Sequence, residues 1–161
     1  MKPSRYVVFL SKKKVIISAC LLGEYCRYDG KTKQINEVLE AFSAYEIIPF
    51  CPEAPLFGTP RERISVVQVG DKQRIITDET VKDVTQLLSD EIESFCAKHK
   101  NVDAIVLKSK SPSCGYKTTP ILDEKKNILK LGSGIAANIL QKKYPHILLQ
   151  DERVYLKSDL K

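Results

Sequence analysis

The chain has 161 residues, 43% of them hydrophobic and 29% charged, with a formal net charge of +6. This length suits one ordinary domain, and the apolar content is sufficient for a core that needs no cysteine cross-links. No apolar run approaches the about 20 residues that cross a bilayer, and the N-terminus lacks the cleavage site of a secretory signal. We therefore expect a cytoplasmic protein without a membrane partner.

The first half of the chain predicts two strands, a helix and a hairpin. The β-rich run 15–19 is bounded by a loop and predicts a buried strand. Apolar residues recur at helical spacing in 31–45, so a helix is expected there. The run 46–51 predicts a second strand, although Pro49 weakens the pattern near its end. Two β-rich runs around a Gly-Asp pair in 64–77 predict a β-hairpin.

The second half predicts two helices and two strands. The segment 81–99 places its apolar residues on one stripe and is the clearest helix of the chain. A strand is expected over 102–108. A helix opened by glycines covers 132–144 and ends before Pro145, and a last strand follows at 146–150.

The alternation of strands and helices predicts the architecture. It is typical of an α/β domain with a mostly parallel sheet and helices on both faces, to which the β-hairpin is added. We expect one domain over residues 15–161, preceded by an N-terminal extension of residues 1–14.

The positive charge is spread along the chain. Lysine groups stand at 12–14, 125–126 and 142–143 and do not form one stripe. A net positive charge of +6 fits an anionic ligand such as a nucleotide, and also weak nucleic-acid binding. Because most of these lysines are explained by solvation of the surface, we do not expect nucleic acid as a partner.

Three of the five cysteines follow predicted strands. Cys20 and Cys51 end the first two strands, and Cys114 lies in the loop after 102–108. Ligand sites of open parallel sheets lie outside the carboxyl ends of the strands, so we expect these thiols at one edge. A single strand-end cysteine is more often a core residue, but three at the same edge predict a metal or catalytic site.

The other two cysteines differ from these three. Cys26 lies in the same loop as Cys20 and is a fourth candidate for the site. Cys96 falls on the apolar side of the 81–99 helix, where a free cysteine packs as a small hydrophobic residue. The odd number of cysteines and the expected compartment argue against a disulfide framework.

Three thiolates at one edge favour a soft metal, namely zinc, copper(I) or an iron–sulfur cluster. Structural zinc takes four ligands, usually in short paired spacings that this chain lacks. A four-cysteine zinc site made by Cys20, Cys26, Cys51 and Cys114 stays open, in a small binding or interaction protein without enzymatic activity. Iron–sulfur clusters commonly take four cysteines, and three would leave one iron free for substrate. A metal-free cysteine nucleophile is the third hypothesis, ranked last because Arg27 is a poor general base.

Polar residues near the cysteines are candidates for the chemistry. Glu53 stands between two prolines close after Cys51 and suits a general acid or base; the alternative is a loop carboxylate paired with an arginine. Ser111 and Ser113 flank Pro112, where they suit a hydrogen-bond donor or a proton relay; the alternative is ordinary turn chemistry.

Other polar residues of these loops suit substrate contacts. Arg27 suits a phosphate or carboxylate, Tyr28 suits stacking on a base, and Arg61 and Arg63 suit an anion. The glycine-rich start of the helix at 132–144 also favours anions, although as a motif it is weak.

Four blocks of the chain resemble a known family. They are "SACLLGEYCRYDG", "FCPE" followed by "TPR", "LKSKSPSCG" and "GSGIAA". In this order, from about residue 15 to 140, they are similar to the TudS-like thiouracil desulfurases. The resemblance implies a Rossmann-like α/β domain with a [4Fe-4S] cluster, whose three ligands here would be Cys20, Cys51 and Cys114.

The resemblance also implies a reaction. The open iron would act as a Lewis acid on the sulfur of a thiolated pyrimidine, such as 2-thiouracil or 4-thiouridine monophosphate. Water would replace the sulfur, and sulfide would leave without net redox chemistry. Glu53 matches the catalytic glutamate and Ser111 the catalytic serine, with Ser113 as the neighbouring alternative.

The remaining site residues form the expected substrate wall, which consists of Cys26, Arg27, Tyr28, Ser113 and Arg61. The chain departs from the family where "APLFGTPRER" carries only Gly58 instead of a glycine pair, which affects substrate choice and leaves the cluster untouched. The relatives that act on transfer RNA carry a second domain, so a free base or mononucleotide is expected here.

Overall fold

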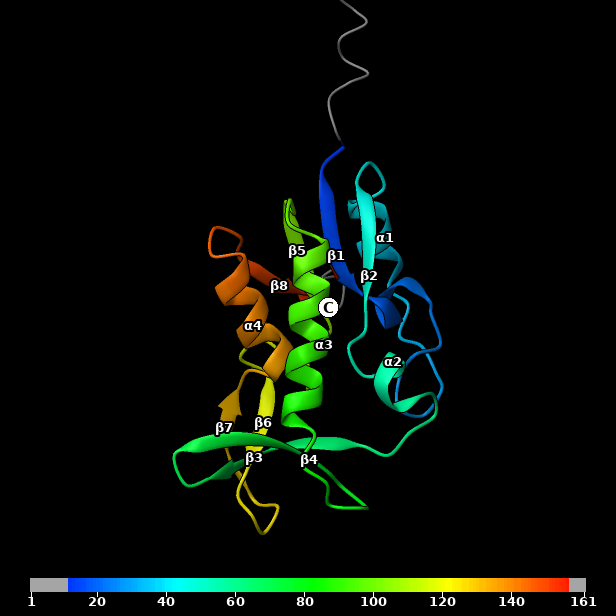
Figure 1. Cartoon of the computed structure of the whole chain (residues 1–161). Helices are drawn as coiled ribbons and strands as arrows, with labels where there is room; N and C mark the ends of the chain where they lie inside the picture. Colours follow the sequence, from blue (N-terminus) through cyan, green and yellow to red (C-terminus); the bar gives the residue numbers. More distant parts are fainter. Residues whose placement is uncertain (1–11, 157–161) are drawn as a thin grey trace, which may run out of the picture.

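The computed structural model describes residues 12–156, which form two four-stranded sheets with helices around them (Figure 1). The first sheet has the order β2-β1-β5-β8, formed by β1 (Lys14–Ser18), β2 (Glu46–Phe50), β5 (Ala104–Leu107) and β8 (Leu149–Asp151). The second has the order β4-β3-β6-β7, formed by β3 (Ile64–Val69), β4 (Lys72–Thr77), β6 (Thr119–Leu122) and β7 (Ile128–Gly132). The α-helices are α1 (Asn36–Ala41), α2 (Ala54–Phe57), α3 (Thr85–Lys98) and α4 (Ile135–Lys143).

The first sheet is parallel throughout and has apolar residues on both faces. Val15 and Ile17 of β1 pack in one cluster with Val38 of α1. Ile16 points to the opposite face and packs in a second cluster with Leu88 of α3. A strand that alternates in this way must be covered on both sides, so the prediction of an α/β fold with helices on both faces is confirmed.

The pairing register brings the ends of the strands together. Ser18 of β1 pairs with Phe50 of β2, and Ile17 pairs with Val106 of β5, all in parallel. The three strands therefore finish at the same edge, and the segments that carry the cysteines leave from it. This edge positions the site.

The second sheet is a feature that the sequence did not predict. The expected hairpin at 64–77 is present as β3 and β4, but it pairs through β3 with a second hairpin, β6 and β7. Strand β7 carries Ile128, Leu129 and Leu131, which are 66%, 53% and 63% exposed. Its side chains do not alternate between core and solvent, so the usual signal of a strand is missing.

All three predicted helices are shorter in the structure: the one expected over 81–99 covers Thr85–Lys98, and the other two begin later than expected. The helix expected at 31–45 begins only at Asn36, because the amides of Lys33 and Ile35 donate to the carbonyls of Cys20 and Leu21. The helix expected at 132–144 begins at Ile135, since Gly132 is the last residue of β7 and the amide of Gly134 donates to the carbonyl of Gly115. In both places the chain before the helix makes hydrogen bonds that a helical backbone would not allow.

The ends of the chain are described only in part. Residues 1–11 and 157–161 lie outside the described residues, so the expected extension of residues 1–14 falls largely outside them as well. Strand β1 begins at Lys14, the last residue of that expected extension. Within residues 12–156 no helix has the length and hydropathy needed to cross a membrane.

Candidate active site

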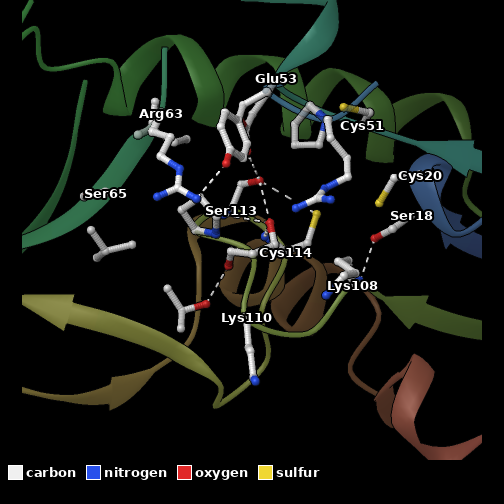
Figure 2. Close-up of a pocket in the computed structure, with 18 of the residues that line it drawn as sticks. Ser18, Cys20, Cys51, Glu53, Arg63, Ser65, Lys108, Lys110, Ser113 and Cys114 are labelled. Carbon is white, nitrogen blue, oxygen red and sulfur yellow. Dashed lines mark hydrogen bonds between the residues drawn. The ribbon is translucent and has the colours of Figure 1, made fainter. Parts of the chain in front are cut away.

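The segments that follow β1, β2 and β5 enclose a cavity of about 610 Å³ together with β3 and β6. Cys20, Cys51 and Cys114 all line it, and Figure 2 shows their three sulfur atoms toward one side of the close-up. We call this space the cysteine cavity. The structure thus brings together three residues that lie far apart in the sequence, at the edge where the strand order placed them.

Cys20 is held by its backbone. It lies in a short 3-10 turn, Ala19–Leu22, that ends at Gly23 with a φ of 98°. Its carbonyl accepts hydrogen bonds from the hydroxyl of Thr32 at 2.8 Å and from the amide of Lys33 at 3.0 Å. These contacts fix the direction in which the Cys20 side chain leaves the sheet.

Cys26 lies beside the thiols of the other cysteines. The Cys51 Sγ is 3.8 Å from the carbonyl of Cys26 and accepts a hydrogen bond from the amide of Ala54 at 3.4 Å. A hydrogen bond with Cys20, together with burial, raises the pKa of Cys26 to about 11, against a smaller opposing effect of Cys51. The sequence placed Cys26 in the substrate wall, and the structure shows that it contacts two of the expected ligands.

The thiols of Cys51 and Cys114 are held in the protonated form by their surroundings. A hydrogen bond with Cys26 and burial raise the pKa of Cys51 well above its ordinary value. Burial, followed by the nearby Cys51, raises the pKa of Cys114 to about 12. A metal displaces such protons because it binds the thiolate, so these cysteines are poor free nucleophiles at neutral pH and suitable metal ligands.

Glu53 faces the cavity from the loop after β2. Its side chain is buried, with 7% of the residue exposed, and one carboxylate oxygen accepts a hydrogen bond from the Ser113 hydroxyl at 2.6 Å. The other oxygen accepts one from Arg61 Nε at 3.1 Å. Figure 2 shows this Glu53–Ser113 contact in the middle of the site. The carboxylate is thereby fixed in one orientation.

The two candidate serines have different partners. Ser113 contacts Glu53, whereas the Ser111 hydroxyl accepts hydrogen bonds from the amide of Cys114 at 3.0 Å and from the amide of Ser113 at 3.3 Å. The two hydroxyls are 3.4 Å apart. Since Ser113 gives its one proton to Glu53, Ser111 is the donor between them, and the three side chains form a row that a proton can follow.

Arg61 is occupied by the protein itself. Its guanidinium donates to Glu53, to the carbonyl of Cys26 at 2.9 Å and to the carbonyl of Gly58 at 3.0 Å. Its side chain is only 6% exposed. The sequence placed Arg61 in the substrate wall. The structure shows instead that the Arg61 side chain joins the loop of Cys26 to the loop of Glu53 through its hydrogen bonds.

Arg27 and Tyr28 line the cavity as the sequence expected. The Tyr28 hydroxyl accepts a hydrogen bond from Arg63 at 2.7 Å, and the Arg63 guanidinium lies 4.5 Å from the centre of the Tyr28 ring. Arg27 lies 5.9 Å from the same ring. Two cations therefore border an aromatic ring at the edge of the cavity.

The glycines before α4 serve packing. A Cβ atom on Gly134 would lie 2.4 Å from the carbonyl carbon and oxygen of Ser113. That oxygen accepts a hydrogen bond from the amide of Ala136, in the first turn of the helix. The helix start that suggested anion binding is thus used to hold the loop of the serines.

Sequence reasoning missed several residues of the cavity. Ser65, Asp78 and Lys126 reach it from the second sheet and its connections, and no signal pointed to them because the sequence predicted the hairpin at 64–77 but not that this hairpin borders the cavity. Lys108 also lines the cavity. Its position directly after β5 would have placed it at the same edge as the cysteines.

The spacing of the donors bears on the metal hypotheses. Among residues 12–156, no three His, Cys, Asp or Glu side chains are grouped closely enough to hold a single metal ion. A zinc site made by four cysteines takes four ligands around one ion, and iron–sulfur clusters are likewise held by cysteine thiolates. Three thiols, from Cys20, Cys51 and Cys114, line the cavity from three segments of the chain.

Known proteins were compared with this chain. The model of the family described as 2-thiouracil desulfurase matches residues 15–152. The "Uncharacterized protein YbbK" of Bacillus subtilis (strain 168) is 29% identical and aligns over 86% of this chain and 96% of its own. The solved structure of the [4Fe-4S]-dependent thiouracil desulfidase TudS has 30% identity and a TM-score of 0.65, over 88% of this chain and 92% of that one.

Proposed function

The chain belongs to the 2-thiouracil desulfurase family, and we propose that it removes sulfur from a thiolated pyrimidine base or nucleotide and releases sulfide. The substrates that we propose are of the 2-thiouracil or 4-thiouridine monophosphate type. The observation that carries the proposal is that Cys20, Cys51, Cys114 and Glu53 line one cavity. Thiols and a fixed carboxylate together supply a metal site and a proton acceptor.

The proposed cofactor is a [4Fe-4S] cluster held by Cys20, Cys51 and Cys114. The solved structure that this chain resembles is of a protein described as [4Fe-4S]-dependent. With three thiolate ligands one iron stays open, and when bound it would supply a Lewis acid for the sulfur of the substrate.

Glu53 is the proposed general base. Because Ser113 and Arg61 hold both carboxylate oxygens, the carboxylate is fixed for proton transfer from a water that attacks the carbon bearing the sulfur. The new C–O bond replaces the C–S bond. The water protons pass to the sulfur, so a thiocarbonyl and water give a carbonyl and hydrogen sulfide, with no electron transferred to or from the protein.

The serines are the proposed route for the proton. Ser113 links Glu53 to Ser111, and all three line the cavity. In this row Ser111 is the residue that delivers a proton to the departing sulfur, as its match to the family suggests. Ser113 is the intermediate carrier.

The rest of the cavity supports a small substrate. Tyr28 offers an aromatic ring for the pyrimidine, and Arg27 offers a cation for an anionic group. A volume of about 610 Å³ is within the range of small-molecule sites. We propose a free base or mononucleotide on this basis, and we do not propose nucleic acid as a partner.

Two further proposals concern the whole protein. Ile16 of the first sheet and Val66 of the second lie in the same core cluster, which supports one domain over residues 15–161. Three free thiols that line one cavity suit the reducing cytoplasm, where they are not oxidised to disulfides.

Anaerobic reconstitution tests the proposal. Iron, acid-labile sulfide and zinc are measured in the wild-type chain and in the variants Cys20→Ala, Cys51→Ala, Cys114→Ala and Cys26→Ala, and sulfide release is measured with 2-thiouracil and 4-thiouridine monophosphate. We expect the first three variants to lose the cluster and the activity, and Cys26→Ala to keep the cluster. Stoichiometric zinc that requires all four cysteines, and no sulfide release, would establish the structural-zinc alternative instead.

A further inference from the structure

Asp78 lines the cysteine cavity from the side of the second sheet and has no part in the chemistry described so far. It is the first residue after β4, and its amide donates to the carbonyl of Arg63 at 2.8 Å. Its Oδ1 accepts a hydrogen bond from the Ser65 hydroxyl at 2.7 Å and lies 3.4 Å from the ammonium of Lys126. The backbone and the side chain of Asp78 are therefore both held in place.

The second oxygen of the Asp78 carboxylate is open to a ligand. Among the residues that the structure describes, both donors to this side chain share Oδ1, and none contacts Oδ2. The side chain is 30% exposed, so water or a ligand can reach it. Because an ionised carboxylate only accepts hydrogen bonds, Oδ2 offers an acceptor to a hydroxyl or an N–H group of the ligand.

Glu53 is the other acidic residue that lines the cavity in the described part of the chain. Its two oxygens already accept hydrogen bonds from Ser113 and Arg61. Asp78 is thus the carboxylate of this cavity with an oxygen left for a ligand. Hydrogen bonds to a charged acceptor are roughly twice as strong as those between neutral groups, so a donor bound at Asp78 contributes to recognition.

Asp78 and the thiols lie on opposite sides of the site. Figure 2 shows Ser65, which donates to Asp78, on one side and the sulfur atoms of Cys20 and Cys51 on the other, with Ser113 between them. A substrate whose sulfur is bound at the thiols therefore presents its remote part to Asp78. In 4-thiouridine monophosphate the sulfur on C4 and the ribose on N1 stand across the pyrimidine ring, and the donors of the ribose are its 2′ and 3′ hydroxyls.

The chemistry of Asp78 matches a ribose. An acidic side chain is the acceptor of a ribose hydroxyl in many nucleotide sites. We propose that Asp78 recognises the ribose of a thiolated ribonucleotide by accepting a hydrogen bond from one of these two hydroxyls; this rests on the proposed function. A site built to bind a hydroxyl rejects a ligand that lacks it, so Asp78 selects the ribonucleotide over the analogue without this hydroxyl.

Isothermal titration calorimetry of the full chain, reconstituted without air, tests this inference with the product nucleotide. The ligands are uridine monophosphate and its 2′-deoxy and 3′-deoxy analogues. The proteins are the wild type, Asp78→Ala, Asp78→Asn and the control Asp71→Ala, which removes an exposed acidic residue from the turn between β3 and β4. We expect the wild type and Asp71→Ala to bind one of the analogues about 10- to 100-fold more weakly than uridine monophosphate. Asp78→Ala should bind all three ligands with about the Kd of that analogue.

The other results of the titration each decide the inference. No binding of uridine monophosphate, equal affinity of the wild type for the three ligands, or the full preference in Asp78→Ala overturns it. If Asp78→Ala shows no thermal unfolding transition, Asp78→Asn decides: a reduced preference supports the inference, and an unchanged one overturns it.

Sulfide release from 4-thiouridine monophosphate is measured separately, so the two proposals can fail apart. A wild-type preference that is lost in Asp78→Ala, without any sulfide release, supports the ribose contact and overturns the proposed function. Sulfide release without a preference among the three ligands overturns the inference alone.

Discussion

Ser113 donates a hydrogen bond of 2.6 Å to Glu53, 60 positions earlier in the chain. This contact joins the loop after β2 to the loop after β5, and both residues are buried. A short hydrogen bond to a carboxylate is among the stronger interactions in a protein. It therefore fixes the relative position of a proposed base and of the loop that carries a proposed ligand, Cys114.

The Glu53–Ser113 contact predicts different effects for the two serines. Ser113→Ala leaves a buried carboxylate with one partner fewer, which costs about 1.5–3 kcal/mol, and we expect kcat for sulfide release to fall roughly 10- to 100-fold. Ser111→Ala keeps the Glu53 contact, so the melting temperature changes less while kcat still falls. Equal loss of stability in both variants, with unchanged kcat in Ser113→Ala, would contradict the proposed relay.

Arg61 is predicted to act on kcat and stability. Its donors hold Glu53 and the carbonyl of Cys26, and breaking a buried ion pair costs about 3–5 kcal/mol. We expect Arg61→Gln to lower the melting temperature and kcat with little change of KM. Arg74→Gln is the control, because its pair with Asp83 is exposed and is worth about 1 kcal/mol or less. A raised KM with unchanged stability would instead indicate direct substrate binding.

Gly134 is predicted to tolerate no side chain. In Gly134→Ala the new methyl group would lie 2.4 Å from the backbone of Ser113, so the loop or the helix must shift, at about 1–3 kcal/mol. We expect a lower free energy of unfolding in urea and a lower kcat. The neighbouring surface variant Asn138→Ala should change stability by about 0.5 kcal/mol or less. A Gly134→Ala variant as stable and active as the wild type would show that the loop is not held by this contact.

Asp83 is predicted to make stability depend on pH. Although burial opposes it, hydrogen bonds from Arg74 and Thr85 lower the pKa of Asp83 to about 2. The stabilisation is therefore present above the ordinary value near 4 and is lost as the pH falls toward 2. Since Asp83 is 40% exposed, screening leaves about 1 kcal/mol or less. Asp83→Asn should be less stable than the wild type at pH 7 and differ less at pH 2, by urea unfolding; an equal difference at both pH values would contradict this.

The sequence predicted the cysteine edge because its signals are local and independent. Each strand of the first sheet reads as a short apolar run, and the parallel arrangement then brings Cys20, Cys51 and Cys114 to one edge. The resemblance to the family added iron and the thiolated pyrimidine, which the residue types alone left open. The pattern of the chain was thus sufficient to predict that these three cysteines lie at one edge of the sheet.

The second sheet and the partners of each side chain could not be predicted. Strand β7 is too exposed to show a pattern, and Pro120 interrupts the run of β6. The choice of Ser113 over Ser111 as the partner of Glu53 depends on the three-dimensional path of one loop, which the spacing of the two serines does not reveal. Arg61 likewise looked like an anion-binding residue, because sequence gives no view of the acceptors that surround it.

The most direct test of the central claim is the origin of the oxygen in the product. The anaerobically reconstituted chain is incubated with 4-thiouridine monophosphate in ¹⁸O-labelled water without any reductant, and the nucleotide is analysed by mass spectrometry while released sulfide is counted. The account predicts uridine monophosphate with one ¹⁸O at the former sulfur position and one sulfide for each product molecule. A product without the label, a need for a reductant, or no sulfide would contradict it.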